Sequence, residues 1–218
     1  MTEQTCGQQT KMDRMYVLQR HIYDLTRKYY LFGRDRLLTS MIIPEHGRVL
    51  EMGCGTARNL IKLAKLRPDL QLYGIDASCR MLETAKKKVV SAGIEQSIAL
   101  NPCLAEDTCH LETFSLTDPF DAVFFSYSLS MIPTWDQALA AGLRNVKPGG
   151  SVYIVDFWDQ NGLPEWFGRL LRSWLALFHV HFRPELLDAV HRLDQAGYEV
   201  DVRSVGRGYA YIARIKKL

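Results

Sequence analysis

The stretch Val49-Leu50-Glu51-Met52-Gly53-Cys54-Gly55-Thr56-Ala57-Arg58-Asn59 decides the fold, because a short apolar run passes in it directly into two closely spaced glycines. The apolar run predicts a strand over 48–52, and the pattern after the glycines predicts a helix over 56–66. Glycines at a strand-to-helix junction let the backbone turn tightly and let a ligand approach it closely. The junction therefore predicts a ligand-binding turn at the carboxyl end of the first strand of an α/β sheet.

Strands and helices alternate outward from this junction. We expect further strands over 71–76, 97–100, 120–126 and 151–157, helices over 78–91, 134–146, 164–178 and 184–197, a turn over 148–150, and a hairpin over 198–205 and 209–215. Such alternation is typical of a doubly wound, mostly parallel α/β sheet, here closed by an antiparallel C-terminal hairpin. The length of 218 residues suits one domain over 11–218, preceded by a polar tail over 1–10.

Composition excludes several classes of protein. Hydrophobic residues make up 47% and charged residues 23% of the chain, which disfavours disordered, collagen-like and coiled-coil proteins. The sequence shows no signal peptide or membrane-spanning run, and its five cysteines form no CxxC pair, so we expect a cytoplasmic protein with reduced thiols. Cys103, Cys109 and His110 are too few for a metal-ligand set, and we expect no metal.

Asp76, at the end of the second strand, is the acidic partner of the glycine turn. A carboxylate at that position can accept hydrogen bonds from both hydroxyls of a ribose. A dinucleotide site requires a third glycine where Arg58 stands, which disfavours nicotinamide and flavin cofactors. The pattern acidic-x-Gly-x-Gly-x-small, matched by Glu51, Gly53, Gly55 and Ala57, instead suits a cationic nucleoside cofactor without pyrophosphate.

Residues 49–56, together with Gly74-Ile75-Asp76, Phe120-Asp121-Ala122-Val123 and Pro148-Gly149-Gly150, resemble the class I S-adenosylmethionine-dependent methyltransferases. The resemblance implies a seven-stranded Rossmann-like methyltransferase sheet and S-adenosylmethionine as cofactor. It also implies a cofactor-binding set of Glu51, Gly53, Gly55, Asp76, Ala77, Met81, Leu104, Ala105, Glu106 and Ser126. In this set Glu51 and the glycines line the methionine part, Asp76 holds the ribose, and residues 104–106 flank the adenine. Ala57 replaces the usual third glycine of the family.

A second resemblance concerns the acceptor. The stretches 12–16, 20–30, 33–36 and 125–133, with Asp156-Phe157, are similar to the bacterial betaine-lipid N-methyltransferases. That family trimethylates the homoserine amine of a diacylglyceryl lipid. The resemblance therefore implies a lipid substrate with an amino-acid headgroup, in a protein that contacts the inner surface of the membrane peripherally.

The N-terminal segment carries seven Lys/Arg against three Asp between residues 11 and 36, whereas the residues after it sum to zero charge. We expect a basic, tyrosine-rich helical segment over 11–36, in which Thr10 can cap the helix and Gly33 can end it. One stripe, which includes Met15 and Phe32, docks on the domain; another alternates tyrosine with arginine and includes Arg34. The alternative is a plain solvated basic face. We expect Tyr23 to reach the cofactor pocket as a catalytic residue, and the substrate-binding residues to be Tyr16, Arg27 and Tyr30.

Residues 158–174 contain three tryptophans and two arginines among leucines. Two interpretations stay open: a helix that simply covers the sheet, or an apolar roof that admits acyl chains, since tryptophan favours membrane interfaces.

Methyl transfer to an amine needs alignment more than a strong base, because a free α-amino group has a pKa near 8. Tyr127, after the fourth strand, is the predicted catalytic residue that would accept from the amine or stabilise the growing ammonium. Alternatives are a methyltransferase acting on a soluble amine or a quinone, a cofactor-binding interaction protein without turnover, and an RNA-binding homologue. Nucleic acid is not expected, because the excess of positive charge is confined to one helix face. The sequence leaves the oligomeric state open.

Overall fold

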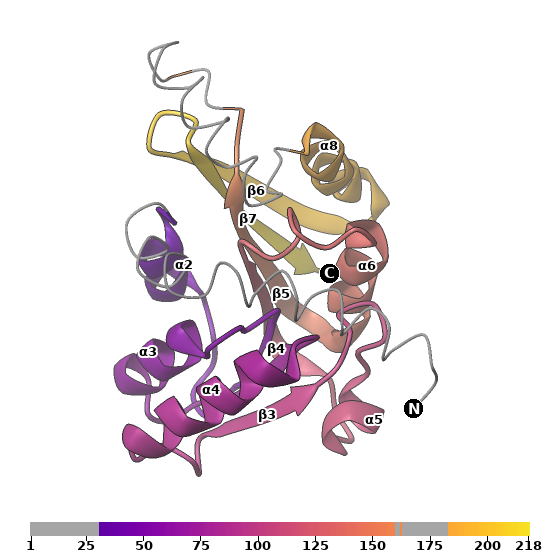
Figure 1. Ribbon diagram of the computed structural model, residues 1–218. Coiled ribbons are helices and arrows are strands. Elements are labelled where there is room, and N and C mark those ends of the chain that lie inside the picture. Colours follow the sequence, from indigo (N-terminus) through magenta and orange to yellow (C-terminus); the bar gives the residue numbers. More distant parts are fainter. Residues whose placement is uncertain (1–30, 160–161, 163–182) are drawn as a thin grey trace.

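The computed structural model describes residues 31–159, 162 and 183–218, which form one seven-stranded sheet with helices on both faces (Figure 1). The strands are β1 (Arg48–Met52), β2 (Gln71–Asp76), β3 (Ile98–Pro102), β4 (Phe120–Ser126), β5 (Val146–Phe157), β6 (Tyr198–Val205) and β7 (Ala210–Lys217). Their order is β3-β2-β1-β4-β5-β7-β6. The first five strands pair in parallel, whereas β7 runs antiparallel to β5 and β6. The predicted fold class is therefore confirmed.

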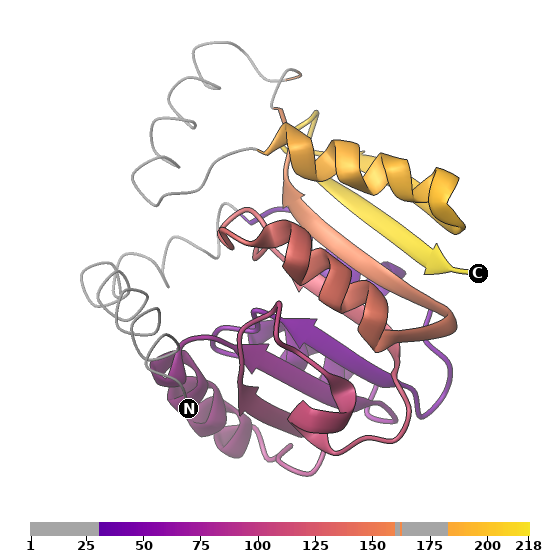
Figure 2. The ribbon, with the colours of Figure 1, turned by 90° about the vertical axis from the view of Figure 1, so that its right-hand side faces the viewer.

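Helices cover both faces of the sheet. The helices are α2 (Arg34–Ser40), α3 (Arg58–Leu66), α4 (Cys79–Ser91), α5 (His110–Phe114), α6 (Trp135–Asn145) and α8 (Pro184–Leu193), followed by the 3₁₀ turn η1 (Asp194–Ala196). Helices α2, α3 and α4 lie on one face and α5, α6 and α8 on the other, which Figures 1 and 2 show from two sides. None of the described helices is long and apolar enough to cross a membrane.

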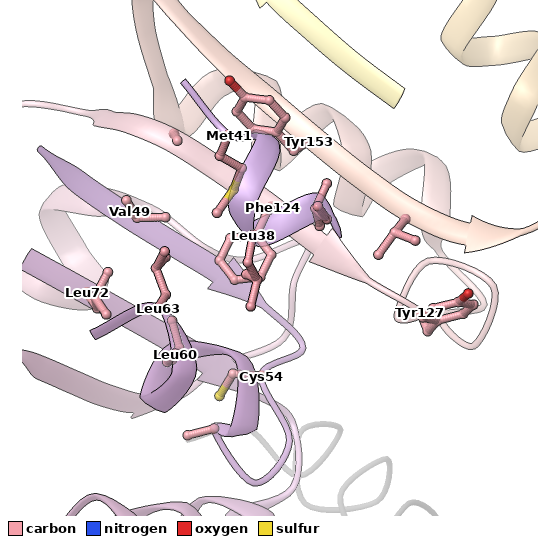
Figure 3. Packing of buried hydrophobic residues seen from close by; sticks show 14 of the residues in the cluster. Leu38, Met41, Val49, Cys54, Leu60, Leu63, Leu72, Phe124, Tyr127 and Tyr153 are labelled. Atoms are coloured by element: carbon pink, nitrogen blue, oxygen red, sulfur yellow. The ribbon is translucent and has the colours of Figure 1, made fainter. Parts of the chain in front are cut away.

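The buried apolar residues form two layers that the sheet separates. One layer joins Leu38 of α2 and Leu60 and Leu63 of α3 to Phe124 of β4 (Figure 3). The other joins Phe125 of β4 to α6 and α8. Because β4 is buried along its whole length, its alternating side chains enter both layers. Burial on both faces explains why this strand reads as a continuous apolar run.

Most predicted elements are confirmed, and the differences have local causes. Strands 48–52, 71–76, 120–126 and 198–205 begin and end where predicted. The stretch 148–150 is not a separate turn, because β5 begins at Val146 and continues through it, with a register shift against β4. Helix α5 was not predicted. The helix expected over 164–178 lies outside the described residues.

The N-terminal helix expected over 11–36 lies largely outside the described residues, but its end is corrected. Residues 31–33 are not helical, and Gly33, with a left-handed φ of 87°, precedes a separate helix, α2, so no continuous helix runs on to residue 36. Arg34 is buried, and its Nε donates to the Leu31 carbonyl. Phe32, expected on the docking stripe, is 55% exposed. Both expectations fail because residues 31–33 are not helical, so the helical rotation that grouped Phe32 and Arg34 with the preceding residues does not extend to them.

Asp121, in the stretch Phe120-Asp121-Ala122-Val123, is a structural residue at the amino end of β4. Its Oδ2 accepts a hydrogen bond from the Arg48 backbone N at 2.8 Å, and its Oδ1 pairs with Lys147. Gly150 lies against the same residue, since a Cβ there would meet the Asp121 carbonyl oxygen at 2.6 Å. These contacts align β1, β4 and β5, so that their carboxyl ends meet at the opposite edge of the sheet.

Candidate functional site

The glycine turn between β1 and α3 is held open by its backbone conformation. Gly53 and Gly55 have φ angles of 81° and 54°, values that glycine adopts at little cost. The backbone N–H groups of Gly53 and Cys54 both donate to the Ile75 carbonyl, at 2.9 and 2.8 Å, so the turn is fixed to β2. A Cβ on Gly53 would lie 2.7 Å from the Ser128 Cβ. The turn therefore leaves no room for a side chain at this position.

Ala57 takes the left-handed conformation in which the family has a third glycine. Its φ is 57°, and it is the N-cap of α3. An alanine in this region costs roughly 1–2 kcal/mol relative to the ordinary helical region. The neighbouring turn keeps the conformation, because the Ala57 N–H donates to the Cys54 carbonyl at 2.9 Å.

Asp76 lies at the carboxyl end of β2 with its carboxylate fixed by backbone donors. Oδ2 accepts from the Gly55 N–H at 2.8 Å, and Oδ1 accepts from the Ser78 N–H at 2.9 Å. A carboxylate oxygen can accept more than one hydrogen bond, so ligand hydroxyls can bind to the same oxygens. Ala77 and Met81, also predicted to bind the cofactor, are half-buried at the start of α4, which Ser78 caps by accepting from the Met81 N–H.

Glu51 is buried in β1, two residues before Gly53. Its Oε1 accepts a hydrogen bond from Asn59 Nδ2 at 2.7 Å, and Arg58 donates to the Asn59 Oδ1 at 3.1 Å. Asn59 was not predicted as a site residue. Its position in the first turn of the helix after the glycines, eight residues after Glu51, could have indicated this contact.

Two carboxylates, those of Asp76 and Glu51, lie close to the glycine turn. Burial, followed by the charges of Asp76 and Glu51, raises the pKa of the Cys54 thiol well above its ordinary value. A thiol whose ionisation is opposed by two carboxylates reports a site that favours positive charge. The residues present therefore fit a cationic cofactor with ribose hydroxyls, such as the one expected from the sequence.

The segment after β3 is fixed to α6. Glu106, predicted beside the adenine, accepts a hydrogen bond at its Oε1 from the Thr134 hydroxyl at 2.7 Å. Leu104 is half-buried and accepts at its carbonyl from Thr108, whereas Ala105 is buried. The contact of these three residues with a ligand stays a prediction.

The segment after β4 lies against the glycine turn. Ser128 Oγ donates to the Met52 carbonyl at 2.9 Å. Ser126 is buried, and its Oγ has no hydrogen-bond partner among the described residues. A buried hydroxyl without a partner is costly unless a ligand or water satisfies it. This hydroxyl therefore supports the expectation that Ser126 contacts a ligand.

Tyr127 has a left-handed backbone, with φ 55°, and is 2% exposed. Its hydroxyl donates to the Phe32 carbonyl, and its ring packs edge-to-face on Phe157 with centroids 4.6 Å apart. Burial, followed by the nearby Tyr209 and Asp156, raises the pKa of the phenol well above its ordinary value. The hydroxyl expected to face the methyl acceptor is thus bonded to backbone here, and the catalytic role of Tyr127 stays a prediction.

Asp156, at the end of β5, holds the segment after β4 and was not predicted as a site residue. It is 1% exposed; Oδ2 accepts from the Ser130 N–H at 3.0 Å and Oδ1 from the Phe157 N–H at 2.9 Å. Arg183, preceding α8, donates to the Ser130 carbonyl at 3.2 Å. Burial raises the pKa of Asp156 to about 6, despite its hydrogen bonds to Ser130 and Phe157. In the sequence, a single carboxylate within an apolar predicted strand could have indicated that Asp156 has a specific role.

The remaining predicted residues lie outside the described part of the chain. These are the catalytic Tyr23 and the substrate-binding Tyr16, Arg27 and Tyr30, as well as most of the 158–174 segment. Within the described residues, no group of three or more His, Cys, Asp or Glu could hold a metal ion.

Comparison with known sequences gives a family match and several relatives. A family profile described as a methyltransferase domain matches residues 43–193. The chain is 33% identical over 118 residues to a carboxy-S-adenosyl-L-methionine synthase of Campylobacter curvus, covering 54% of this chain and 47% of that protein. It is 27% identical over 141 residues to the ubiquinone/menaquinone biosynthesis C-methyltransferase UbiE of Geotalea daltonii, covering 62% and 58%. The chain spans about half the length of the curated relatives it matches.

Solved structures share the fold. An S-adenosylmethionine-dependent methyltransferase of Aquifex aeolicus superimposes with a TM-score of 0.62 at 20% identity, covering 93% of this chain and 96% of that one. A Haloferax volcanii protein solved in complex with the methyltransferase activator Trm112 gives a TM-score of 0.70 at 13% identity, covering 94% and 98%. At these identities the likeness concerns the fold alone.

Proposed function

Because the chain belongs to the class I S-adenosylmethionine-dependent methyltransferases, with S-adenosylmethionine as its cofactor, we propose that it is an N-methyltransferase acting on a lipid headgroup. The proposed acceptor is the homoserine amine of a diacylglyceryl lipid, which successive transfers convert into the trimethylated betaine lipid. The proposed setting is the cytoplasmic side of the membrane, with peripheral contact.

One observation carries the methyltransferase part of the proposal. The Asp76 carboxylate is fixed by the N–H groups of Gly55 and Ser78 beside a glycine turn that excludes side chains. When bound, S-adenosylmethionine supplies an electrophilic methyl group on a sulfonium. The residues of the chain then have two tasks, which are to orient the ribose through Asp76 and to favour the positive charge through the carboxylates of Glu51 and Asp76.

The acceptor side needs a neutral amine in line with the transferred methyl group. A free α-amino group has a pKa near 8, so a neutral fraction exists at cellular pH, and partial burial increases that fraction. The main task of the protein is therefore alignment. Ser126 and the segment held by Ser128, Ser130 and Asp156 lie at the edge of the sheet where this alignment would be made.

The lipid acceptor is supported by sequence. The stretch 125–133 and the pair Asp156-Phe157 both resemble the betaine-lipid enzymes, and in the fold they form one hydrogen-bonded unit through Ser130. The proposed acceptor contacts of Tyr16, Arg27 and Tyr30, and the proposed reach of Tyr23 into the pocket, rest on the same resemblance.

A second candidate is favoured by the curated relatives. UbiE is named as a C-methyltransferase of ubiquinone and menaquinone biosynthesis, and a demethylmenaquinone methyltransferase of Bacillus velezensis is 31% identical over 136 residues. A quinone ring carbon would replace the amine as acceptor, while the cofactor turn would be used in the same way.

The decisive experiment supplies the purified protein with methyl-labelled S-adenosylmethionine and a choice of acceptors. We expect label in diacylglyceryl-homoserine and none in demethylmenaquinone or soluble amines. The matched control is Asp76→Asn, which should abolish labelling of any true acceptor. Label in the quinone alone would replace the lipid proposal by the second candidate. Cofactor binding without label in any acceptor would favour an interaction protein without turnover.

A further inference from the structure

Two neighbouring helices concentrate positive charge on one face of the molecule. Together α3 and α4 carry seven Lys/Arg and a single carboxylate, Glu83, for a net charge of +6, whereas the whole chain has +3. Residues 101–159 carry eight Asp/Glu against Arg144 and Lys147, a net charge of −6. The near neutrality of the chain after residue 36 is thus a balance between separate regions, and the basic excess is not confined to the N-terminal segment.

The cations of these helices differ in how they are paired. Arg58 and Lys62 contact the Asp35 carboxylate of α2, at 2.9 and 2.6 Å. Lys88 donates to the Thr56 hydroxyl at 3.0 Å. Lys65, Lys86 and Lys87 are exposed and form no ion pair with the described residues. Their charge is therefore available to an external partner.

Each helix also carries an exposed apolar side chain near its carboxyl end. Leu66 is 48% exposed and Val90 is 59% exposed, near the ends of α3 and α4. Between the helices an open groove of about 440 Å³ is lined by Ile61, Lys65, Thr84, Lys87, Lys88, Ser91 and Ala92. We call the surface formed by Lys65, Leu66, Lys86, Lys87, Lys88 and Val90 the α3/α4 basic face. The two helices lie on the same side of the sheet (Figure 1).

We propose that the α3/α4 basic face docks on an anionic lipid bilayer. Lysines attract an anionic membrane with roughly 1 kcal/mol each near the surface, and exposed leucine and valine can enter the headgroup boundary. Nucleic acid fits this face less well, because the residues that line its groove include no aromatic ring on which a base could stack. The docking does not depend on which acceptor is methylated.

This docking would orient the molecule on the bilayer. Helices α3 and α4 begin directly after the glycine turn and after Asp76, so their amino ends lie at the carboxyl edge of the sheet. The lysines of the α3/α4 basic face lie beyond the midpoints of these helices, so docking places the side of the sheet that α3 and α4 cover against the bilayer.

The test is co-sedimentation of the full chain with vesicles of phosphatidylcholine alone and of phosphatidylcholine mixed with phosphatidylglycerol, without cofactor or acceptor. We expect binding to the mixed vesicles only, weakening as salt is raised. Lys65→Gln/Lys87→Gln should reduce partitioning about 30-fold. The matched control is Arg192→Gln/Arg207→Gln, which removes the same charge from exposed positions elsewhere and should leave partitioning within about threefold of the parent.

Three results would overturn the proposal. They are equal binding to both kinds of vesicle, equal loss in both double variants, and undiminished binding of Lys65→Gln/Lys87→Gln, which would assign docking to another part of the chain. A gel-shift with RNA serves as a further arm. RNA binding that is lost in Lys65→Gln/Lys87→Gln, without vesicle binding by the parent, would assign the face to nucleic acid. Unchanged thermal midpoints exclude misfolding as a cause.

Discussion

The two halves of the candidate site are built in different ways. In the cofactor half, around β1 and β2, the contacts join residues close in sequence: Glu51 with Asn59, and Gly55 with Asp76. In the acceptor half, at the ends of β4 and β5, they join distant residues: Tyr127 with Phe32, Ser128 with Met52, and Ser130 with Arg183. The first half is a local unit that a sequence pattern can describe, whereas the second exists only once the whole sheet has formed.

Gly53 is where the two halves touch, and its substitution should have the largest effect. Gly53→Ala places a Cβ 2.7 Å from the Ser128 Cβ in a left-handed backbone. Overpacking and backbone strain together should lower the free energy of unfolding by about 3 to 4 kcal/mol. We expect cofactor affinity, measured by calorimetry below the unfolding temperature, to fall about 100-fold, because the turn must shift.

Gly149→Ala is the matched control for Gly53→Ala. Its φ of 78° imposes the same kind of strain, but no atom lies within 4 Å of the added Cβ. Urea denaturation should show a loss of about 1 to 2 kcal/mol with unchanged cofactor affinity. Equal effects of the two variants would mean that contact between the halves has no special importance.

The buried Asp156 makes the acceptor half sensitive to pH. Its pKa is raised from 3.8 to about 6 by burial, so the folded protein binds a proton more tightly than the unfolded chain. The contribution of this group to stability is therefore present at low pH and is lost as the pH rises through about 6. As the pH rises from below 3.8 to above about 6, the free energy of unfolding should fall by about 3 kcal/mol because of Asp156.

Asp156→Asn should remove this dependence. Urea denaturation of the parent and the variant at several values between pH 4 and pH 7 gives the comparison, and the difference between the two proteins should change over the same window. A difference that is constant with pH would show that Asp156 does not titrate there. The cofactor half should be unaffected, so cofactor affinity should be alike in the two proteins at pH 7.

Tyr127→Phe should have the smallest effect on stability. It removes the hydroxyl that donates to the Phe32 carbonyl, with an expected loss of about 1 kcal/mol. Tyr153→Phe is the control, since that hydroxyl also bonds backbone, accepting from the Ile42 N–H at 2.9 Å away from the edge of the site. We expect both variants to lose similar stability and only Tyr127→Phe to slow methyl transfer; equal rates would exclude the Tyr127 hydroxyl from the reaction.

The cofactor half could be predicted because each of its determinants has a local signal. Glycines after an apolar strand imply the turn, and an acidic residue at the end of the next strand implies its partner. The parallel order of the sheet then brings Gly55 and Asp76 together without further information. Even the alanine at position 57 obeys the pattern, since the surrounding turn imposes the angle that glycine usually takes.

The sequence pointed to Ser126 and Tyr127 in the acceptor half, but the contacts that build this half could not be predicted, because they cross the fold. That a new helix begins after Gly33 depends on how α2 packs on the sheet, which no helical rotation reveals. Likewise Asp156 reads as one polar residue in an apolar strand until Ser130 is folded against it. The phenol of Tyr127 was assigned by its place after β4, but its partner is 95 residues away in the chain.

The hydrogen bond from Tyr127 ends on a main-chain carbonyl, and this has a consequence for how the chain can vary. A substitution at Phe32 leaves the acceptor in place, whatever the new side chain. Inserting or deleting one residue between Phe32 and α2 would instead displace that carbonyl by about 3.8 Å, beyond hydrogen-bond reach. Residue count, more than residue identity, is therefore what this corner of the protein specifies, and natural variants should tolerate exchanges there but not changes of length.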